Sequence, residues 1–192
     1  SIDHSSFAVP DTITDTFGNS KSYDNWDDGI WYFHVRAKDN AGNWGSAEHY
    51  KVKIDTSPPG KPSPTADPSG WTNQDHVMIS WSAVSDGEGS GVDHYEYQID
   101  STSGPWISVS ALTYFTTPPQ SSGIHEVYVR AVDGVGLVGD IGSVEIYIDQ
   151  VAPTTPTTLS PRDGTRLDVG PMFSWSPATD SLSGIASYTL QI

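Results

Sequence analysis

The chain of 192 residues carries a formal net charge of −15, from 24 acidic and 9 basic residues, and it contains no cysteine. An acidic surface of this kind repels phosphate backbones and anionic lipid, so we expect no nucleic acid partner. The lack of cysteine excludes a disulfide framework and thiolate chemistry. No apolar run is long enough to cross a bilayer, so membrane insertion is not expected.

Glycine (18 residues) and proline (14 residues) are frequent, and 35% of the residues are hydrophobic. No stretch combines a 3.6-residue hydrophobic period with helix caps, whereas alternating segments are separated by Pro, Gly, Ser, Thr and Asp. The sequence therefore predicts an all-β fold with almost no helix.

The first clear strand patterns are "GIWYFHVRA" at 29–37 and "KVKID" at 51–55. Alternate residues of the first segment are apolar and are expected to form a core face, while His34 and His49 are expected to face solvent. The expected core residues here are Trp31, Phe33, Val35 and Ala37.

Further along the chain, "VMISW" at 77–81, "HYEYQI" at 94–99 and "GIHEVYVRAVD" at 123–133 alternate in the same way. Strand segments then follow at 143–149 and, near the end, in "FSW" at 173–175. The expected core of the middle region is Val77, Ile79, Trp81, Tyr95, Tyr97, Ile99, Val127, Val129 and Ala131.

These patterns form an internal repeat. Residues 29–45 align with residues 123–139, and Trp81 aligns with Trp175, each at a shift of 94 residues (123 − 29 and 175 − 81). A period near 95 residues is close to the common size of an independently folding domain. The chain is therefore expected to consist of tandem modules.

Three features resemble those of fibronectin type III modules: a Trp that closes one strand, a "YxYxI" or "YxLxI" strand after it, and a later strand that leads into an Asp and Gly turn. The closest resemblance is to modules in tandem on bacterial and archaeal surface proteins and beside catalytic domains of secreted enzymes. The resemblance implies an Ig-like β-sandwich of seven strands, A to G, and an extracellular or cell-surface location. One departure is His125, which stands where the other copy has Trp31.

The strand assignment of that family divides the chain into three parts. Residues 56–149 supply a complete module, residues 1–55 only the C-terminal half (strands C′ to G), and residues 150–192 only the N-terminal half (strands A to C). We expect the two halves to complement each other, with 150–192 completed by residues 1–55 of the next copy or repeat. The expected partners are therefore further copies of the chain, head to tail.

No pattern of catalytic residues emerges. "GVGLVG" at 134–139 matches a dinucleotide-binding fingerprint, but that motif requires a following helix, whereas a strand follows here. We interpret it as a hairpin loop and expect no enzyme activity.

Acidic residues offer one candidate site. In this fold the B–C and F–G loops lie at the pole where the preceding module enters, so Asp55 is expected to approach Asp86, Glu88 and Asp133. In the same way Asp149 would approach Asp180 and, once its module is complete, Asp39. Clustered carboxylates suit Ca²⁺, which would be the only cofactor; the alternative is that each Asp caps its own turn.

Two functions fit these features. The first is a non-catalytic structural repeat of a stalk, sheath, filament or surface layer, acting as spacer and interaction surface. The second is an ancillary module of a secreted enzyme or adhesin that binds protein or carbohydrate, such as surface glycans, through exposed aromatic rings. The tryptophans available for this second role are Trp26, Trp44, Trp71 and Trp106.

Overall fold

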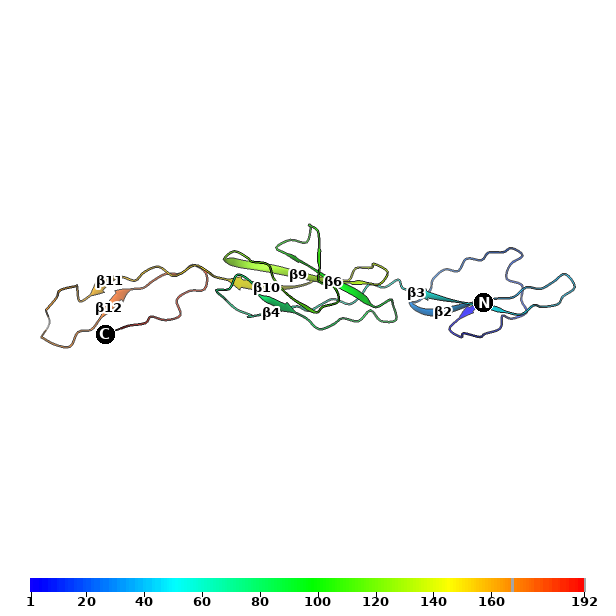
Figure 1. Ribbon diagram of the computed structural model, residues 1–192, viewed down its shortest axis with the longest axis horizontal. Helices are drawn as coiled ribbons and strands as arrows, with labels where there is room; N and C mark the ends of the chain where they lie inside the picture. The colour runs from blue at the N-terminus through cyan, green and yellow to red at the C-terminus, as the bar shows by residue number, and fades with distance from the viewer. Residues whose placement is uncertain (167, 192) are drawn as a thin grey trace.

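The computed structural model describes residues 1–166 and 168–191, and these residues form twelve short strands and no helix. Three groups of strands follow one another along the long axis of the molecule (Figure 1). None of the described residues belongs to a helix that could cross a membrane. The strands are β1 (Ile2–Asp3), β2 (Gly29–Val35), β3 (Glu48–Ile54), β4 (Thr65–Asp67), β5 (Met78–Ser80), β6 (Val92–Ile99), β7 (Ile107–Ser108), β8 (Tyr114–Thr116), β9 (Gly123–Asp133), β10 (Gly142–Ile148), β11 (Thr157–Ser160) and β12 (Ser174–Ser176).

The middle group is a two-sheet sandwich. One sheet has the order β4-β5-β8 and the other the order β10-β9-β6-β7, with antiparallel pairing throughout both. This arrangement of a three-stranded and a four-stranded sheet is that of a fibronectin type III or Ig-like sandwich, as the sequence predicts.

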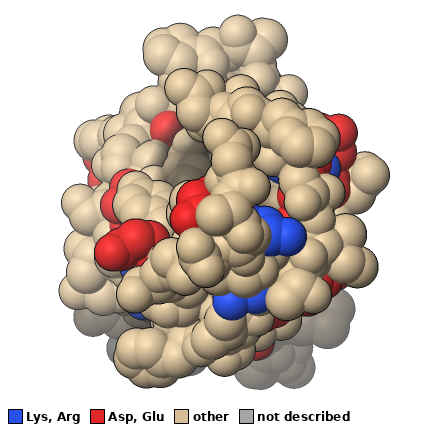
Figure 2. Space-filling model, turned by 90° about the vertical axis from the view of Figure 1, so that its right-hand side faces the viewer, with Lys and Arg blue, Asp and Glu red and all other residues tan. Residues whose placement is uncertain are grey.

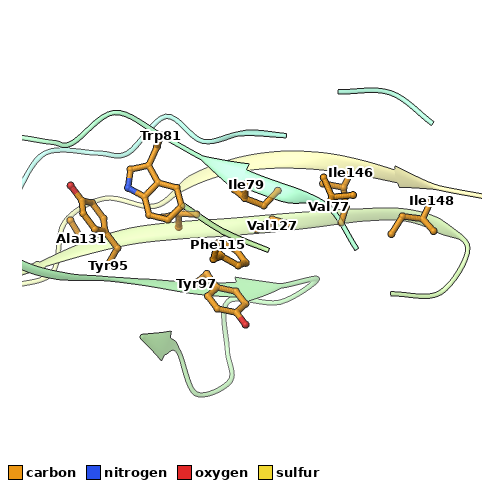
Figure 3. Close-up of a cluster of buried hydrophobic side chains, with 11 residues drawn as sticks. Val77, Ile79, Trp81, Tyr95, Tyr97, Phe115, Val127, Ala131, Ile146 and Ile148 are labelled. Carbon is orange, nitrogen blue, oxygen red and sulfur yellow. The ribbon is translucent and has the colours of Figure 1, made fainter. Parts of the chain in front are cut away.

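The core lies between these two sheets (Figure 3). Trp81 packs edge-on against Tyr95 at 5.2 Å between ring centroids, and Phe115 stacks on Tyr97 at 4.0 Å. All the predicted core residues of the middle region are buried except Ile99, which is half-buried and packs against the core. The alternation pattern thus identified the buried face correctly.

The polypeptide that enters the middle group packs against β10 and the turn before it. A Cβ atom at Gly142 would lie 2.0 Å from the carbonyl oxygen of Pro62, and one at Gly139 would lie 2.4 Å from that of Pro59. Only glycine fits at these two positions, because the backbones of two segments touch there. The Pro-rich entrance of the middle group is therefore held tightly to the sandwich.

The N-terminal group is a single sheet of order β1-β2-β3. The β2–β3 hairpin has the same register as the β9–β10 hairpin. Val35 pairs with Glu48, and the residues 94 positions later, Val129 and Gly142, also pair with each other. Within residues 1–166 and 168–191 no second sheet covers it, so the expected core face stays partly open and Val35 is 50% exposed.

The prediction that His34 faces solvent is wrong, whereas His49 is exposed as expected. His34 is buried because β1 pairs with the outer edge of β2 and covers it. Its Nδ1 lies 2.6 Å from Nδ1 of His49, and its Nε2 lies 3.3 Å from a carboxylate oxygen of Asp3.

The C-terminal group repeats the corner of the middle group that holds Trp81. Trp175 packs edge-on against Tyr188 at 5.3 Å, and the Tyr188 hydroxyl accepts a hydrogen bond from the Ala178 amide at 2.9 Å. In the middle group Tyr95 accepts the equivalent bond from Val84 at 3.0 Å. Ile192, the last residue of the expected third strand, lies outside the described residues.

Candidate metal centre

Three carboxylates meet where the N-terminal group joins the middle group. Asp55 directly follows β3, Asp86 lies in the loop between β5 and β6, and Asp133 ends β9. One oxygen atom from each lies within 4.8 Å of one from each of the others. Asp133 is 2% exposed and Asp86 is 9% exposed, so the site is largely shielded from water.

Backbone amides orient two of these carboxylates. The Ser90 amide donates to Oδ2 of Asp55, and the Gly91 amide donates to Oδ2 of Asp86, both at 2.7 Å. Consecutive amides of the β5–β6 loop therefore hold one aspartate from their own loop and one from the linker. These donors fix one oxygen of each carboxylate and leave the other free.

Asp133 is held by the turn that follows it. Its Oδ1 accepts hydrogen bonds from the amides of Val135 and Leu137, at 2.9 and 2.8 Å. This is the "GVGLVG" segment, which connects β9 to β10 as a hairpin loop, as interpreted from the sequence. The carboxylate that caps the loop thus has a fixed orientation at the junction.

The second oxygen of each carboxylate is buried and has no hydrogen-bond partner: Asp55 Oδ1, Asp86 Oδ1 and Asp133 Oδ2. Buried anionic oxygens without a partner are costly, because they lose hydration and gain nothing in return. Two unit charges 4.8 Å apart repel by about 3.5 kcal/mol at an effective dielectric constant of about 20. A bound cation would offset this repulsion, and an all-oxygen donor set is the kind that hard cations prefer.

Gly89 permits the close approach of two of these carboxylates. A Cβ atom at this position would lie 2.6 Å from Oδ2 of Asp86 and 2.8 Å from Oδ1 of Asp55. Both carboxylates therefore face the same backbone surface. Gly89 and the Ser90 and Gly91 amides were not predicted from the sequence, where the small residues of "GEGSG" at 87–91 are the only pattern that indicates them.

Of the predicted site residues, Glu88 does not join this group. Its side chain is exposed, and the carboxylates that come together are Asp55, Asp86 and Asp133. Residue 88 lies in the turn at 87–88, between Asp86 and Gly89. Sequence proximity to Asp86 did not ensure spatial proximity to the other two.

The junction between the middle and C-terminal groups has the same backbone geometry. Oδ2 of Asp149 accepts from the Ser183 amide at 3.1 Å, and Oδ1 of Asp180 accepts from the Gly184 amide at 2.9 Å. Hydrogen bonds, chiefly from the Ser183 hydroxyl, hold the pKa of Asp149 below its usual range. Because Oδ1 of Asp149 also accepts a bond from Val151, both of its oxygens are occupied here.

Asp39 is the counterpart of Asp133 in the N-terminal group. Its Oδ1 accepts from the Asn43 amide at 2.8 Å, as Asp133 accepts from Leu137, 94 residues later. The Asn43 side-chain amide donates to the other oxygen, and these bonds lower the pKa of Asp39. Asp39 is exposed and does not approach Asp149 or Asp180 within this chain.

No protein-family model matches the chain, and a search of curated proteins gives no match. Among solved structures the chain is similar to fibronectin type III and related modules. The similarity to domains d3–d4 of the rat CD45 extracellular region has 13% identity and a TM-score of 0.43, over 73% of this chain and 77% of that one. The similarity to the fibronectin(III)-like modules of Clostridium thermocellum CbhA has 17% identity and a TM-score of 0.36, and it covers 64% of this chain and 63% of that one.

A further similarity is to the twitchin kinase region from C. elegans, at 21% identity and a TM-score of 0.37. It covers 47% of this chain and 17% of the twitchin structure. The chain thus spans less than a fifth of that structure and less than two thirds of the CbhA structure. The fold assignment itself rests on the strand order of the two sheets.

Proposed function

We propose that this chain is a non-catalytic structural repeat of an extracellular or cell-surface array, in which modules join head to tail and act as rigid spacers. The observation that carries this proposal is the repetition of the module junction. Rigid joints between like modules are what a spacer needs, because flexible joints would let the array collapse.

At each junction the linker forms equivalent hydrogen bonds with the groups on both sides. The Thr56 amide donates to Asp28 at 2.6 Å, and 94 residues later the Gln150 amide donates to Ser122 at 2.9 Å. On the far side, the amides of Gly60 and Thr154 donate to carbonyl oxygens in the following group, both at 2.9 Å. Linkers fixed at both ends favour a single relative orientation of neighbouring modules.

An apolar groove in the N-terminal group supports the head-to-tail partner. The groove has a volume of about 750 Å³, and its walls include Phe33, Val52 and Ile54. Their counterparts 94 residues later, Val127, Ile146 and Ile148, are at most 1% exposed because the facing sheet covers them. Viewed from this end, the molecule presents a mainly uncharged surface with scattered charged groups (Figure 2).

The occupant we assign to this groove is the segment equivalent to residues 150–191 in a neighbouring copy of the repeat. In the middle group, β5 covers the same face through Ile79, and the residue 94 positions later is Phe173. Phe173 is 59% exposed, and Leu190 is 68% exposed. Each segment therefore leaves open the apolar surface that the other would bury.

A carbohydrate-binding role has less support. A flat, open row of tryptophans would favour it, but the Arg36 guanidinium covers the Trp44 ring at 4.4 Å and that of Arg130 covers the Trp106 ring at 4.0 Å. These cation–π contacts occupy the ring faces that a sugar would use.

Small-angle X-ray scattering on chains of one, two and three tandem copies tests the spacer function. The expected maximum dimension grows linearly with copy number while the cross-section stays constant. Growth with roughly the square root of copy number, as for a flexible linker, would contradict the proposal.

A further inference from the structure

We infer that Asp55, Asp86 and Asp133 bind a calcium ion that clamps the N-terminal group to the middle module. This site lies wholly within one chain and does not depend on the array. The three carboxylates approach one another closely, and each has a buried oxygen without a hydrogen-bond partner.

The three carboxylates come from segments far apart in the sequence. Asp55 belongs to the linker, whereas Asp86 and Asp133 come from two different loops of the middle module. A cation bound to all three would connect the linker to both loops at once. Its release would leave the joint with repelling charges in place of a bond.

The free oxygens distinguish this junction from an ordinary capped turn. A turn-capping aspartate uses its oxygens for backbone amides, as Asp149 does with the amides of Val151 and Ser183. At the first junction each aspartate has one buried oxygen that accepts no hydrogen bond. Water cannot easily supply the missing bond to Asp133, because this residue is only 2% exposed. Turn capping therefore accounts for only one of the two oxygens of each carboxylate.

Calcium fits this donor set better than other common cations. The residues that meet are carboxylates with neither histidine nor cysteine among them, which disfavours zinc and other softer metals. Ca²⁺ accepts irregular geometry with six to eight oxygens, so water molecules can complete its shell around three carboxylates. Mg²⁺ requires near-ideal octahedral geometry and is usually held by one or two carboxylates.

The test compares thermal unfolding and calcium titration of the full chain. With 2 mM CaCl₂ the wild-type melting temperature should be about 5 to 10 °C higher than with EDTA, because a ligand that binds only the folded state stabilises it. Isothermal titration with CaCl₂ should give one site per chain. The second junction should add none, since both Asp149 oxygens are already bonded.

Asp133→Asn and Asp86→Asn keep the shape of the site and remove one charge. Both variants should lose the calcium-dependent rise and melt no lower than wild type in EDTA, because charge repulsion is relieved. Glu88→Gln is the matched control: it removes a charge from the same loop outside the cluster, and it should retain the full rise.

Wild-type melting temperatures that agree within 1 °C in calcium and EDTA, with no heat of binding, would overturn the inference. An unchanged calcium response in Asp133→Asn would also overturn it. An equal rise with MgCl₂ at the same concentration would overturn the assignment to calcium.

Discussion

Val129 and Val35 occupy the same position of the repeat, 94 residues apart, yet Val129 is 0% exposed and Val35 is 50% exposed. Both are valines in the first strand of an antiparallel hairpin, and the two hairpins have the same register. The difference is the sheet β4-β5-β8, which faces β9 and has no counterpart over β2 among the described residues. Alternation therefore shows which face of a strand can be buried, while burial itself requires a second sheet.

The largest expected loss of stability is that of Trp81→Ala, compared with Trp175→Ala. Trp81 is 7% exposed and lies in a closed core, so Trp81→Ala should cost about 3 to 5 kcal/mol of unfolding free energy. Trp175→Ala should cost the middle module less than about 0.5 kcal/mol, because Trp175 lies outside it. Denaturant unfolding followed by circular dichroism measures both; a loss below 1 kcal/mol for Trp81→Ala would contradict the assigned core.

The valine pair gives the next effect. Val129→Ala removes a fully buried branched side chain and should cost about 2 kcal/mol, from lost apolar burial and the cavity left behind. Val35→Ala should change the stability by less than about 0.5 kcal/mol. Equal losses in the same denaturation experiment would show that the N-terminal sheet already has a closed core.

Gly89 and Gly70 test the packing of the carboxylates. Gly89→Ala should destabilise the chain by about 1 to 2 kcal/mol, since its methyl group would overlap Asp86 and Asp55 oxygens. A Cβ at Gly70 meets nothing within 4 Å, so Gly70→Ala should be neutral or slightly stabilising. If both variants melt alike, the carboxylates are not held against Gly89.

The smallest expected effect concerns His125, the counterpart of Trp31. Burial alone would lower the pKa of His125, but hydrogen bonds to Asp100 and to the Ser121 carbonyl, together with the Asp100 charge, raise it. A raised folded-state pKa stabilises the protein fully below about pH 6.5, the unfolded value, and this contribution is lost as pH rises through the folded value.

His125→Phe should remove that part of the pH dependence, which is below about 1 kcal/mol. The measurement is the difference in unfolding free energy between wild type and variant at pH 5.5 and 8.5. A difference that is the same at both pH values would show that Asp100 does not stabilise the charged imidazole.

Much of the middle module could be predicted from the sequence, because Val77, Trp81 and their neighbours follow the two-residue period of strands that bury one face. The meeting of Asp55, Asp86 and Asp133 was also predicted, from loop positions in the resembled fold. The burial of His34 was not, since it depends on β1 pairing across more than 30 residues. The exposure of Glu88 depends on the local path of a loop, which no residue pattern encodes.

The claim that the flanking segments are two halves of one module is tested most directly by calorimetry on one copy and on two copies joined in tandem. Unfolding enthalpy scales with the number of folded residues. If the halves form a module at the join, two copies contain three modules and one copy contains one. The total unfolding enthalpy of the two-copy chain should then be about three times that of the one-copy chain, a ratio of 3 to 1.

Trp175→Ala in the first copy, which weakens only the module at the join, should lower that ratio toward 2 to 1. A ratio of 2 to 1 for the unmodified two-copy chain would contradict the account.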